Sequence, residues 1–339
     1  MTSIPQVDII VEWIKDNKTA VATTSSFLIG LFLVRRYLSG GVCRSKNRLH
    51  GKTVVITGAN SGIGKEVSKE LAKRGARLIF GCRDVTKGRE AADKIGRETG
   101  NKMISVYKVD VADLDSVREF SEQIHDSEEN VDILINNAGV YSCPYALTKN
   151  GFETQFGVNY AGHFLLTHLL LDLLKKSVPS RIINTTSVAY KGGKINFDNL
   201  NMKDNYKPSK AYCNSKLAVL LFTRELSRRL KGSGVTVNSV NPGLTNSNLG
   251  RHVTADMSWP RYLLGLAIVG MMFKTPKQGA QTTIYCAVEP SLDEVTGQYF
   301  SDCMQKDVSP PGDDDDVARH LWDTTVKLVG LPEEACSNN

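Results

Sequence analysis

The sequence lacks the residue spacings of a zinc site or a disulfide framework. Its seven cysteines include no C-x-x-C pair, and its six histidines include no H-E-x-x-H motif. The cysteines are odd in number and scattered, at positions 43, 82, 143, 213, 286, 303 and 336. Structural zinc sites and secreted disulfide scaffolds need closely or regularly spaced ligands. We therefore expect no bound metal and a reducing compartment.

The sequence also has little excess of charge. It carries 42 Lys and Arg against 36 Asp and Glu over 339 residues, and no basic run is interleaved with aromatic residues. A nucleic-acid-binding protein needs such a basic patch, so nucleic acid is not an expected partner. The body of the chain contains no linker rich in Pro, Gly or Ser. With 41% hydrophobic residues it has ordinary globular composition, which predicts one domain over residues 51–330.

A run without charge lies near the N-terminus. Residues 20–34 are uncharged, and Arg35 and Arg36 end the run. Fifteen helical residues span about 22 Å, short of the ~30 Å hydrocarbon core, but snorkelling arginines narrow the gap. A cleaved signal peptide is disfavoured, because acidic residues precede the run and no A-x-A site follows. A buried helix is the other alternative. We expect a tail at 1–18, a membrane anchor at 19–38, a basic linker at 39–50 and a second tail at 331–339.

Positive residues predict the orientation of that anchor. Two lysines precede it, and six positive residues follow it closely: Arg35, Arg36, Arg44, Lys46, Arg48 and Lys52. The positive-inside rule then places the following domain in the cytoplasm. The endoplasmic reticulum is the expected membrane.

Strand and helix patterns alternate from residue 51 onward. We expect strands at 53–56, 77–81, 104–109, 132–135, 181–186, 235–240 and 298–301. We expect helices at 61–74, before 96, at 159–176 and at 212–230. Repeated strand–helix units predict a parallel sheet with helices on both faces. The expected fold class is therefore α/β: one Rossmann-like, doubly wound domain preceded by a hydrophobic helix.

A glycine-rich turn joins the first expected strand to the first helix of the body. Residues 57–64 read TGANSGIG. Glycines let the backbone approach a pyrophosphate, and a helix N-terminus favours its negative charge. The sequence thus predicts dinucleotide contacts from Gly58, Asn60, Ser61, Gly62, Ile63 and Gly64.

The end of the second expected strand bears on the choice between NAD and NADP. An acidic residue there would bind the ribose 2′-hydroxyl of NAD. The chain instead has Arg83, with Lys87 a helical turn later, and Asp84 lies one residue too far to be the ribose acid. A guanidinium matches phosphate geometry with two parallel hydrogen bonds, so we expect NADP(H). The alternative is a solvated charge pair on the loop.

Further motifs complete a recognisable order. After the glycine-rich turn come Asn136-Asn137-Ala138-Gly139, Ser187, Tyr212-x-x-x-Lys216 and Pro242-Gly243. Over roughly residues 50–305 the chain resembles the short-chain dehydrogenase/reductase family. Within that family it looks most like the membrane-anchored retinol dehydrogenases that prefer NADP. The matching stretches are TGANSGIGKE, GCRD, NNAGV, GVNYAGHFLLT, AYCNSKLA and GQYFSDC.

Chemistry and resemblance together assign catalytic roles to four residues. Tyr212 and Lys216 are i and i+4, so they share a helix face. A nearby ammonium is expected to lower the pKa of Tyr212 from its usual ~10, which suits proton exchange with a substrate oxygen. Ser187 ends a strand and can hydrogen-bond the same oxygen. The resemblance implies that Lys216 also binds the nicotinamide ribose and that Asn159, opening a long helix, holds a relay water.

Other cofactor contacts are implied by the resemblance alone. These are Asp110 and Val111 at adenine, Asn137, Ala138 and Gly139 along the cofactor, and Pro242, Gly243 and Thr245 at the nicotinamide carboxamide. Two positions depart from common family patterns: Thr186 replaces a frequent serine, and Ser247 replaces a frequent threonine.

The substrate is expected to be apolar. Residues 262–273 read YLLGLAIVGMMF, which suits a pocket roof, a bilayer contact or a buried helix. The chain is therefore expected to interconvert an apolar alcohol and its aldehyde or ketone, with retinol and retinal as the foremost pair. Alternatives are a steroid or lipid-carbonyl reductase, and an NADP-binding scaffold or sensor without turnover. Homo-oligomerisation stays open. The acidic run at 313–316 is expected to be a solvated loop.

Overall fold

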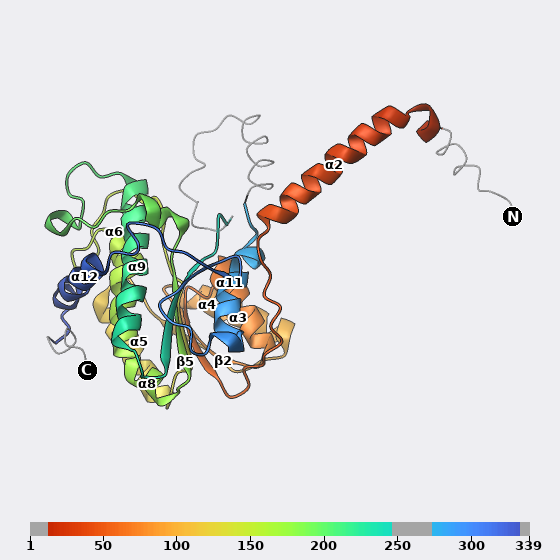
Figure 1. The fold of residues 1–339 in the computed structure, drawn as a ribbon. Coiled ribbons are helices and arrows are strands. Elements are labelled where there is room, and N and C mark those ends of the chain that lie inside the picture. Colours follow the sequence, from red (N-terminus) through yellow and green to blue (C-terminus); the bar gives the residue numbers. More distant parts are fainter. Residues whose placement is uncertain (1–12, 246–272, 333–339) are drawn as a thin grey trace.

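The computed structural model describes residues 13–245 and 273–332 (Figure 1). Ser247 and the expected apolar segment at 262–273, apart from Phe273, lie outside the described residues.

A single eight-stranded sheet forms the centre of the body, in the order β3-β2-β1-β4-β5-β6-β7-β8. All neighbouring strands are parallel except β7 and β8, which are antiparallel. This order, with its reversal between β1 and β4, is that of doubly wound dinucleotide-binding folds, so the expected fold class is confirmed. The strands are β1 (Thr53–Thr57), β2 (Arg77–Cys82), β3 (Ile104–Lys108), β4 (Ile133–Asn136), β5 (Ser180–Thr185), β6 (Val235–Asn241), β7 (Tyr299–Ser301) and β8 (Met304–Lys306).

Helices cover both faces of the sheet. The described helices are α2 (Lys18–Leu38), α3 (Gly62–Lys73), α4 (Val85–Thr99), α5 (Leu114–Ser127), α6 (Thr154–Phe156), α7 (Gly162–Leu169), α8 (Leu171–Lys176), α9 (Pro208–Arg229), α11 (Pro276–Val288) and α12 (Asp315–Leu328). Short turns are η1 (Gly157–Ala161), η2 (Val188–Gly192), η3 (Phe197–Asn199) and η5 (Pro290–Leu292). Alternate residues of a strand point to opposite faces. Val54 thus packs with α3 and α11, whereas Val55 packs with α5, α7 and α9.

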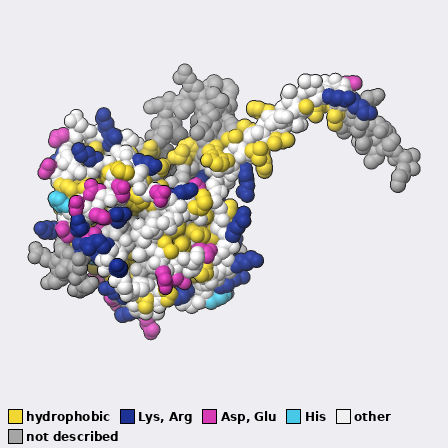
Figure 2. Space-filling model, viewed as in Figure 1, with side chains coloured by type: hydrophobic (Ala, Val, Ile, Leu, Met, Phe, Trp, Pro, Cys, Tyr) yellow, Lys and Arg dark blue, Asp and Glu magenta, His cyan; other side chains and the backbone are white. Residues whose placement is uncertain are grey.

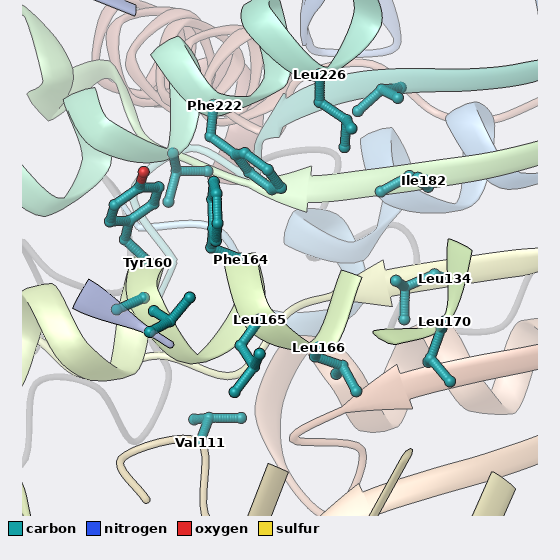
Figure 3. Close-up of a cluster of buried hydrophobic side chains, with 14 of the residues drawn as sticks. Val111, Leu134, Tyr160, Phe164, Leu165, Leu166, Leu170, Ile182, Phe222 and Leu226 are labelled. Atoms are coloured by element: carbon teal, nitrogen blue, oxygen red, sulfur yellow. The ribbon is translucent and has the colours of Figure 1, made fainter. Parts of the chain in front are cut away.

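The core on the α7–α9 side is rich in aromatic rings (Figure 3). The ring of Phe164 lies 5.0 Å from that of Phe222 and 5.1 Å from that of Trp322. Tyr160 is fully buried, and its hydroxyl is hydrogen-bonded to Thr325 Oγ1 at 2.8 Å. Because edge-to-face ring pairs stabilise beyond their buried area, this cluster fixes α7, α9 and α12 against one another.

The prediction of one continuous helix over residues 159–176 is wrong. The segment begins with the π-helical turn η1, and Leu170 separates α7 from α8. At the start of α7 the chain passes very close to the loop after β3, since a Cβ on Gly162 would lie 2.0 Å from the carbonyl oxygen of Val111. Single π turns in helices are frequent at functional sites, and this one carries Asn159.

The acidic run at 313–316 is a helix start rather than a loop. Asp314 accepts hydrogen bonds from the N–H groups of Asp316 and Val317, so it is the N-cap of α12. Asp315 pairs with Arg224 on α9. Carboxylates at a helix N-terminus are stabilised by its unpaired N–H groups, which explains the run.

The N-terminal helix α2 projects from the body (Figure 1) and exposes its hydrophobic side chains (Figure 2). It has 21 residues and a mean hydropathy of 1.2, and it is the one described helix long and apolar enough to cross a membrane. Its length is about 31 Å. The alternative of a buried helix is contradicted, because none of its most apolar part is buried.

The linker after α2 is docked onto the body. Cys43 donates its N–H to Gln281 of α11 over 3.1 Å. Arg74 donates to the carbonyl oxygens of Ser45 and Asn47 at 2.9 and 2.8 Å, and Leu49 is buried. The route of the chain between α2 and the body is therefore fixed by hydrogen bonds and burial.

Candidate active site

Two glycines shape the turn between β1 and α3. Gly58 and Gly62 have φ of +69° and +55°, a left-handed backbone that favours glycine. A Cβ on Gly64 would lie 2.3 Å from the carbonyl oxygen of Gly58. The turn thus brings bare backbone to the surface at the start of a helix, which is a cradle for phosphate oxygens.

A groove of about 790 Å³ begins at this turn and crosses the carboxyl ends of the central strands. Its walls come from elements far apart in the sequence. Among the expected cofactor contacts it is lined by Gly58, Asn60, Ser61, Gly62, Ile63, Gly64, Arg83, Lys87, Asp110, Val111, Asn137, Ala138, Gly139, Tyr212, Lys216 and Pro242. The expected contacts Gly243 and Thr245 are not among its lining residues; they continue the chain just beyond Pro242.

Basic residues stand at the β2 end of the groove. Arg83 is exposed and has no ion pair among the described residues. Lys87 lies 3.1 Å from Asp84, and the Asp84 carboxylate also accepts the backbone N–H of Lys87. These hydrogen bonds hold the pKa of Asp84 below its usual range. Asp84 is thus the N-cap of α4, and it leaves the Arg83 guanidinium free to meet an anion.

Tyr212, Ser187 and Lys216 meet at the inner end of the groove. The Ser187 hydroxyl lies close enough to the Tyr212 phenol to lower its pKa, and its Oγ accepts the N–H of Ala189 over 3.2 Å. Lys216 Nζ donates to the carbonyl oxygen of Thr185 over 2.9 Å and lies 5.6 Å from the centre of the Tyr212 ring. A phenol, a hydroxyl and an ammonium therefore converge from α9 and the end of β5.

The pKa of Tyr212 differs in direction from the expectation. Burial raises it to about 12, against the smaller lowering effect of the Ser187 hydroxyl. Burial also lowers the pKa of Lys216 to about 8. The ammonium of Lys216 does not lower the pKa of Tyr212 as expected. Lys216 donates to the Thr185 carbonyl instead, and at this distance the effect of burial on the phenol outweighs the attraction of the ammonium.

Asn159 braces the site through its whole side-chain amide. Its Oδ1 accepts the N–H of Val140 over 2.8 Å, and its Nδ2 donates to Val140 O and to Ser215 Oγ at 3.1 and 2.9 Å. It is buried within η1 instead of opening a long helix. The amide therefore joins the loop after β4 to the helix that carries Tyr212.

A buried threonine–histidine pair behind the groove was missed by sequence reasoning. Thr57 Oγ1 accepts the N–H groups of Asn137 and Ala138, both over 3.0 Å. Its one proton is left for His163 Nε2, 2.9 Å away. Burial lowers the pKa of His163 to about 4, so the ring is neutral and its Nδ1–H donates to the Asn159 carbonyl over 3.3 Å. The pair links the loop after β4 to η1.

Tyr141 is a second residue that the sequence motifs did not single out. Its ring meets the Tyr212 ring edge to face, with centroids 4.7 Å apart. The Tyr141 ring therefore forms part of the immediate surroundings of the Tyr212 phenol. No spacing in the sequence relates residue 141 to residue 212, so only tertiary structure reveals it.

The turn after β6 is held by hydrogen bonds among its own residues. Gly243 has φ of +77°, and its N–H donates to Asn241 Oδ1 over 3.0 Å. Thr245 Oγ1 donates to the carbonyl oxygens of Pro242 and Gly243, at 3.4 and 3.2 Å.

Across residues 13–245 and 273–332, no cluster of His, Cys, Asp or Glu is arranged to hold a metal ion.

Comparison with known proteins agrees with this geometry. The model of the short chain dehydrogenase family matches residues 52–258. The chain is 49% identical to mouse retinol dehydrogenase 13, over 92% of its own length and 93% of that protein. It is 50% identical to human retinol dehydrogenase 11, over 88% of its own length and 92% of that protein.

Solved structures share the fold. An uncharacterized protein from Mycobacterium paratuberculosis has a TM-score of 0.69 and 34% identity, covering 86% of this chain and 98% of that one. A Pseudomonas aeruginosa RhlG complex with NADP has a TM-score of 0.61 and 25% identity, covering 75% of this chain and 95% of that one.

Proposed function

The chain belongs to the short-chain dehydrogenase family and is an oxidoreductase that acts on alcohols with a nicotinamide cofactor, and from that premise we propose that it is a membrane-anchored, NADP(H)-dependent retinal reductase. The observation that carries the proposal is the convergence of Tyr212, Ser187 and Lys216 at the inner end of a groove whose outer end holds an unpaired arginine.

The described residues fit a dinucleotide. The bare backbone of Gly58, Gly62 and Gly64 at the start of α3 suits a pyrophosphate. Arg83 and Lys87 line the groove after β2, where a 2′-phosphate of NADP would be held, and Asp84, the carboxylate between them in the sequence, is engaged as the N-cap of α4. This arrangement supports NADP(H) over NAD(H). The bound cofactor supplies or accepts the hydride.

The chain's own residues handle the proton. Tyr212 donates its phenolic proton to the substrate oxygen in reduction and takes it back in oxidation. Ser187 hydrogen-bonds the same oxygen and stabilises the charge that develops there. Lys216 holds positive charge next to the phenol, and Asn159 fixes the distance between the loop after β4 and α9. Loss of the Asn159 amide would therefore shift the loop after β4 relative to the helix that carries Tyr212.

The protonation state of Tyr212 suits a carbonyl substrate. Because burial raises the pKa of Tyr212 to about 12, the phenol of the cofactor-free chain is protonated at neutral pH and can donate its proton to a carbonyl oxygen. This supports testing the carbonyl compound first as the substrate.

Retinal is the substrate we propose from the relatives and from the anchor. Both named relatives are retinol dehydrogenases at about half identity over nearly full length. A helix able to cross a membrane places the site near lipid-soluble substrates. The basic residues that follow α2 support a cytoplasmic domain on the endoplasmic reticulum, with the catalytic domain running from about residue 51 to 330.

The test uses the purified full chain in detergent with all-trans-retinal and either NADPH or NADH. We expect retinol formation with NADPH, slow formation with NADH, and at least a 100-fold loss in Tyr212→Phe with NADPH binding retained. Cofactor binding without turnover of retinal would refute the retinal assignment, and a panel of steroids and lipid aldehydes would then identify the carbonyl. Turnover unchanged in Tyr212→Phe would refute the proton-transfer role.

A further inference from the structure

Lys274 is the second residue that the structure describes after the gap at residues 246–272. Its N–H donates to the carbonyl oxygen of Leu244 over 2.7 Å, and it forms a β-bridge with Thr245. The side chain is buried, and its Nζ lies 2.5 Å from Asp302 Oδ1. A buried ammonium is tolerated only when it is paired, so this ion pair holds Lys274 in one place.

The side chain of Lys274 packs on the turn after β6. A Cβ added to Gly243 would lie 3.0 Å from Lys274 Nζ and 3.1 Å from its Cε. The lysine therefore touches the glycine backbone directly. A shift of Lys274 would carry the Pro242–Gly243 turn with it, since the Lys274 backbone is also bonded to Leu244 in the same turn.

The same ion pair touches the segment that follows the membrane helix. A Cβ on Gly40 would lie 2.1 Å from Asp302 Oδ1 and 2.5 Å from Lys274 Nζ. A Cβ on Gly41 would lie 1.9 Å from the backbone oxygen of Asp302. Both glycines thus lie against the pair with no room for a side chain, and Gly40 has φ of +72° besides.

Hydrogen bonds on the preceding residues keep that segment docked. Arg35, in the last turn of α2, donates to the carbonyl oxygen of Phe273 over 3.1 Å. Gln278 of α11 donates to Ser39 Oγ over 2.9 Å. Figure 1 shows the end of α2 meeting the body beside α11. The contacts therefore run without a break from the membrane helix to Lys274.

We propose that Lys274 is a positioning residue through which the docked segment, residues 35–43, fixes the nicotinamide end of the cofactor groove. The inference rests on the proposed function in one respect, the assignment of Pro242 and Gly243 to the nicotinamide carboxamide. Lys274 does not touch the reacting atoms; it sets the turn that does. The adenine and pyrophosphate ends of the groove are built by other elements, β1, β2 and α3, so they do not depend on it.

The first test separates the two ends of the cofactor without requiring turnover. NADP⁺ is compared with 2′-phospho-ADP-ribose, which lacks only the nicotinamide. In Lys274→Met, which keeps the side-chain length but removes the charge, we expect the Kd of NADP⁺ to rise about tenfold. The Kd and stoichiometry of the fragment should stay within about twofold. Lys274→Arg, which keeps a cation for Asp302, should restore at least part of the NADP⁺ affinity.

The second test asks whether the docked segment acts through Lys274. Gly40→Ala should also weaken NADP⁺ and spare the fragment. Gly51→Ala is the matched control, because Gly51 has nearly the same φ, +74°, but nothing within 4 Å of an added Cβ. In the double variant Gly40→Ala/Lys274→Met the loss should be no larger than in Lys274→Met alone, since coupled residues are not additive.

Each outcome bears on the proposal. Equal weakening of NADP⁺ and fragment, or no change in either, would overturn the positioning role of Lys274. Multiplied losses in the double variant, or equal effects of Gly40→Ala and Gly51→Ala, would overturn the route through the docked segment. These tests measure only the Kd of NADP⁺ and of the fragment, so they can be interpreted even if the wild-type chain does not reduce retinal. If the wild-type chain prefers NAD⁺, the same comparison is made with NAD⁺ and ADP-ribose.

Discussion

Arg83 differs from its basic neighbour in having no ion-pair partner among the described residues. Lys87 is held by Asp84, whereas the exposed guanidinium of Arg83 lines the groove. A charge-assisted hydrogen bond to phosphate contributes about 1.5–3 kcal/mol, which is roughly 10- to 100-fold in affinity.

Arg83→Ala should therefore raise the KM for NADPH by about 10- to 100-fold and leave the KM for NADH unchanged. Steady-state kinetics with both cofactors would measure this. Arg89→Ala is the control, because Arg89 is exposed on α4, the helix that follows Arg83, but does not line the groove. An equal effect of both variants on NADPH would count against a 2′-phosphate contact at Arg83.

The buried lysine predicts how activity depends on pH. Burial lowers the pKa of Lys216 from 10.5 to about 8, so the ammonium is present below about pH 8 and is lost above it. Tyr212, with a pKa near 12, keeps its proton throughout this window. We expect kcat/KM for NADPH to be level from pH 6 to about 8 and to fall above it. A profile that stays level to pH 10 would contradict the assignment, because kcat/KM reports the free enzyme.

At the residue level, local motifs predicted which side chains line the groove but not how they are tied together. Tyr212 and Lys216 are four residues apart, so a helix alone brings them to one face. Thr57 and His163 are 106 residues apart, and their contact depends on how the start of α7 packs against the end of β1. The raised pKa of Tyr212 likewise follows from burial, which a spacing cannot reveal.

Among the secondary-structure elements, α12 supports the catalytic helix from behind. Trp322 of α12 packs against Phe164 and Phe222, and Arg229 lies over its ring at 4.4 Å. The start of α12 depends on the cap at Asp314, so the cap supports α9 indirectly.

Asp314→Ala should lower the free energy of unfolding by about 1 kcal/mol, the usual loss for an N-cap carboxylate. Thermal or urea unfolding would measure it, with kcat nearly unchanged because α12 does not line the groove. Asp313→Ala is the matched control: an adjacent exposed aspartate that does not cap the helix. A similar loss in both variants would point to general charge effects and away from capping.

The acidic run and the π turn show why some elements were not predicted. Four consecutive aspartates have the composition of a solvated loop, but Asp314 caps the helix that follows and Trp322 is one of several residues that bury its inner face. The apolar stripe at 159–176 indicated one helix, but the close approach of Gly162 to Val111 accompanies a widened turn at Asn159. In both cases tertiary contacts override local preference.

For the whole molecule, alternation of strands and helices was sufficient to predict the architecture. Each βα unit has a single favoured handedness, so the order of elements along the chain leaves few ways to form a parallel sheet. The antiparallel edge strand β8 and the helix α11 were not expected, because β8 has three exposed residues and α11 has a weak apolar stripe.

The exposed apolar surface of α2 predicts membrane association that substitutions can abolish. A charge at the centre of a bilayer costs about 2.5–3.5 kcal/mol in insertion assays. Phe27→Asp/Phe32→Asp should move the full chain from the membrane fraction to the soluble fraction with NADPH binding unchanged. Phe27→Leu/Phe32→Leu should remain with membranes. Membrane retention of the aspartate variant would indicate that other described or flanking residues hold the chain to lipid.

The docking of the linker has a practical consequence for preparing a soluble form of the enzyme. A truncation at residue 51, where the sequence pattern of the catalytic fold begins, would discard Arg35, Ser39 and Cys43 and uncover the surface of α11 that they occupy. A chain that starts at Val34 lacks most of the apolar helix α2 but retains each of these hydrogen bonds. The longer version is the one we expect to crystallise and to keep its affinity for cofactor.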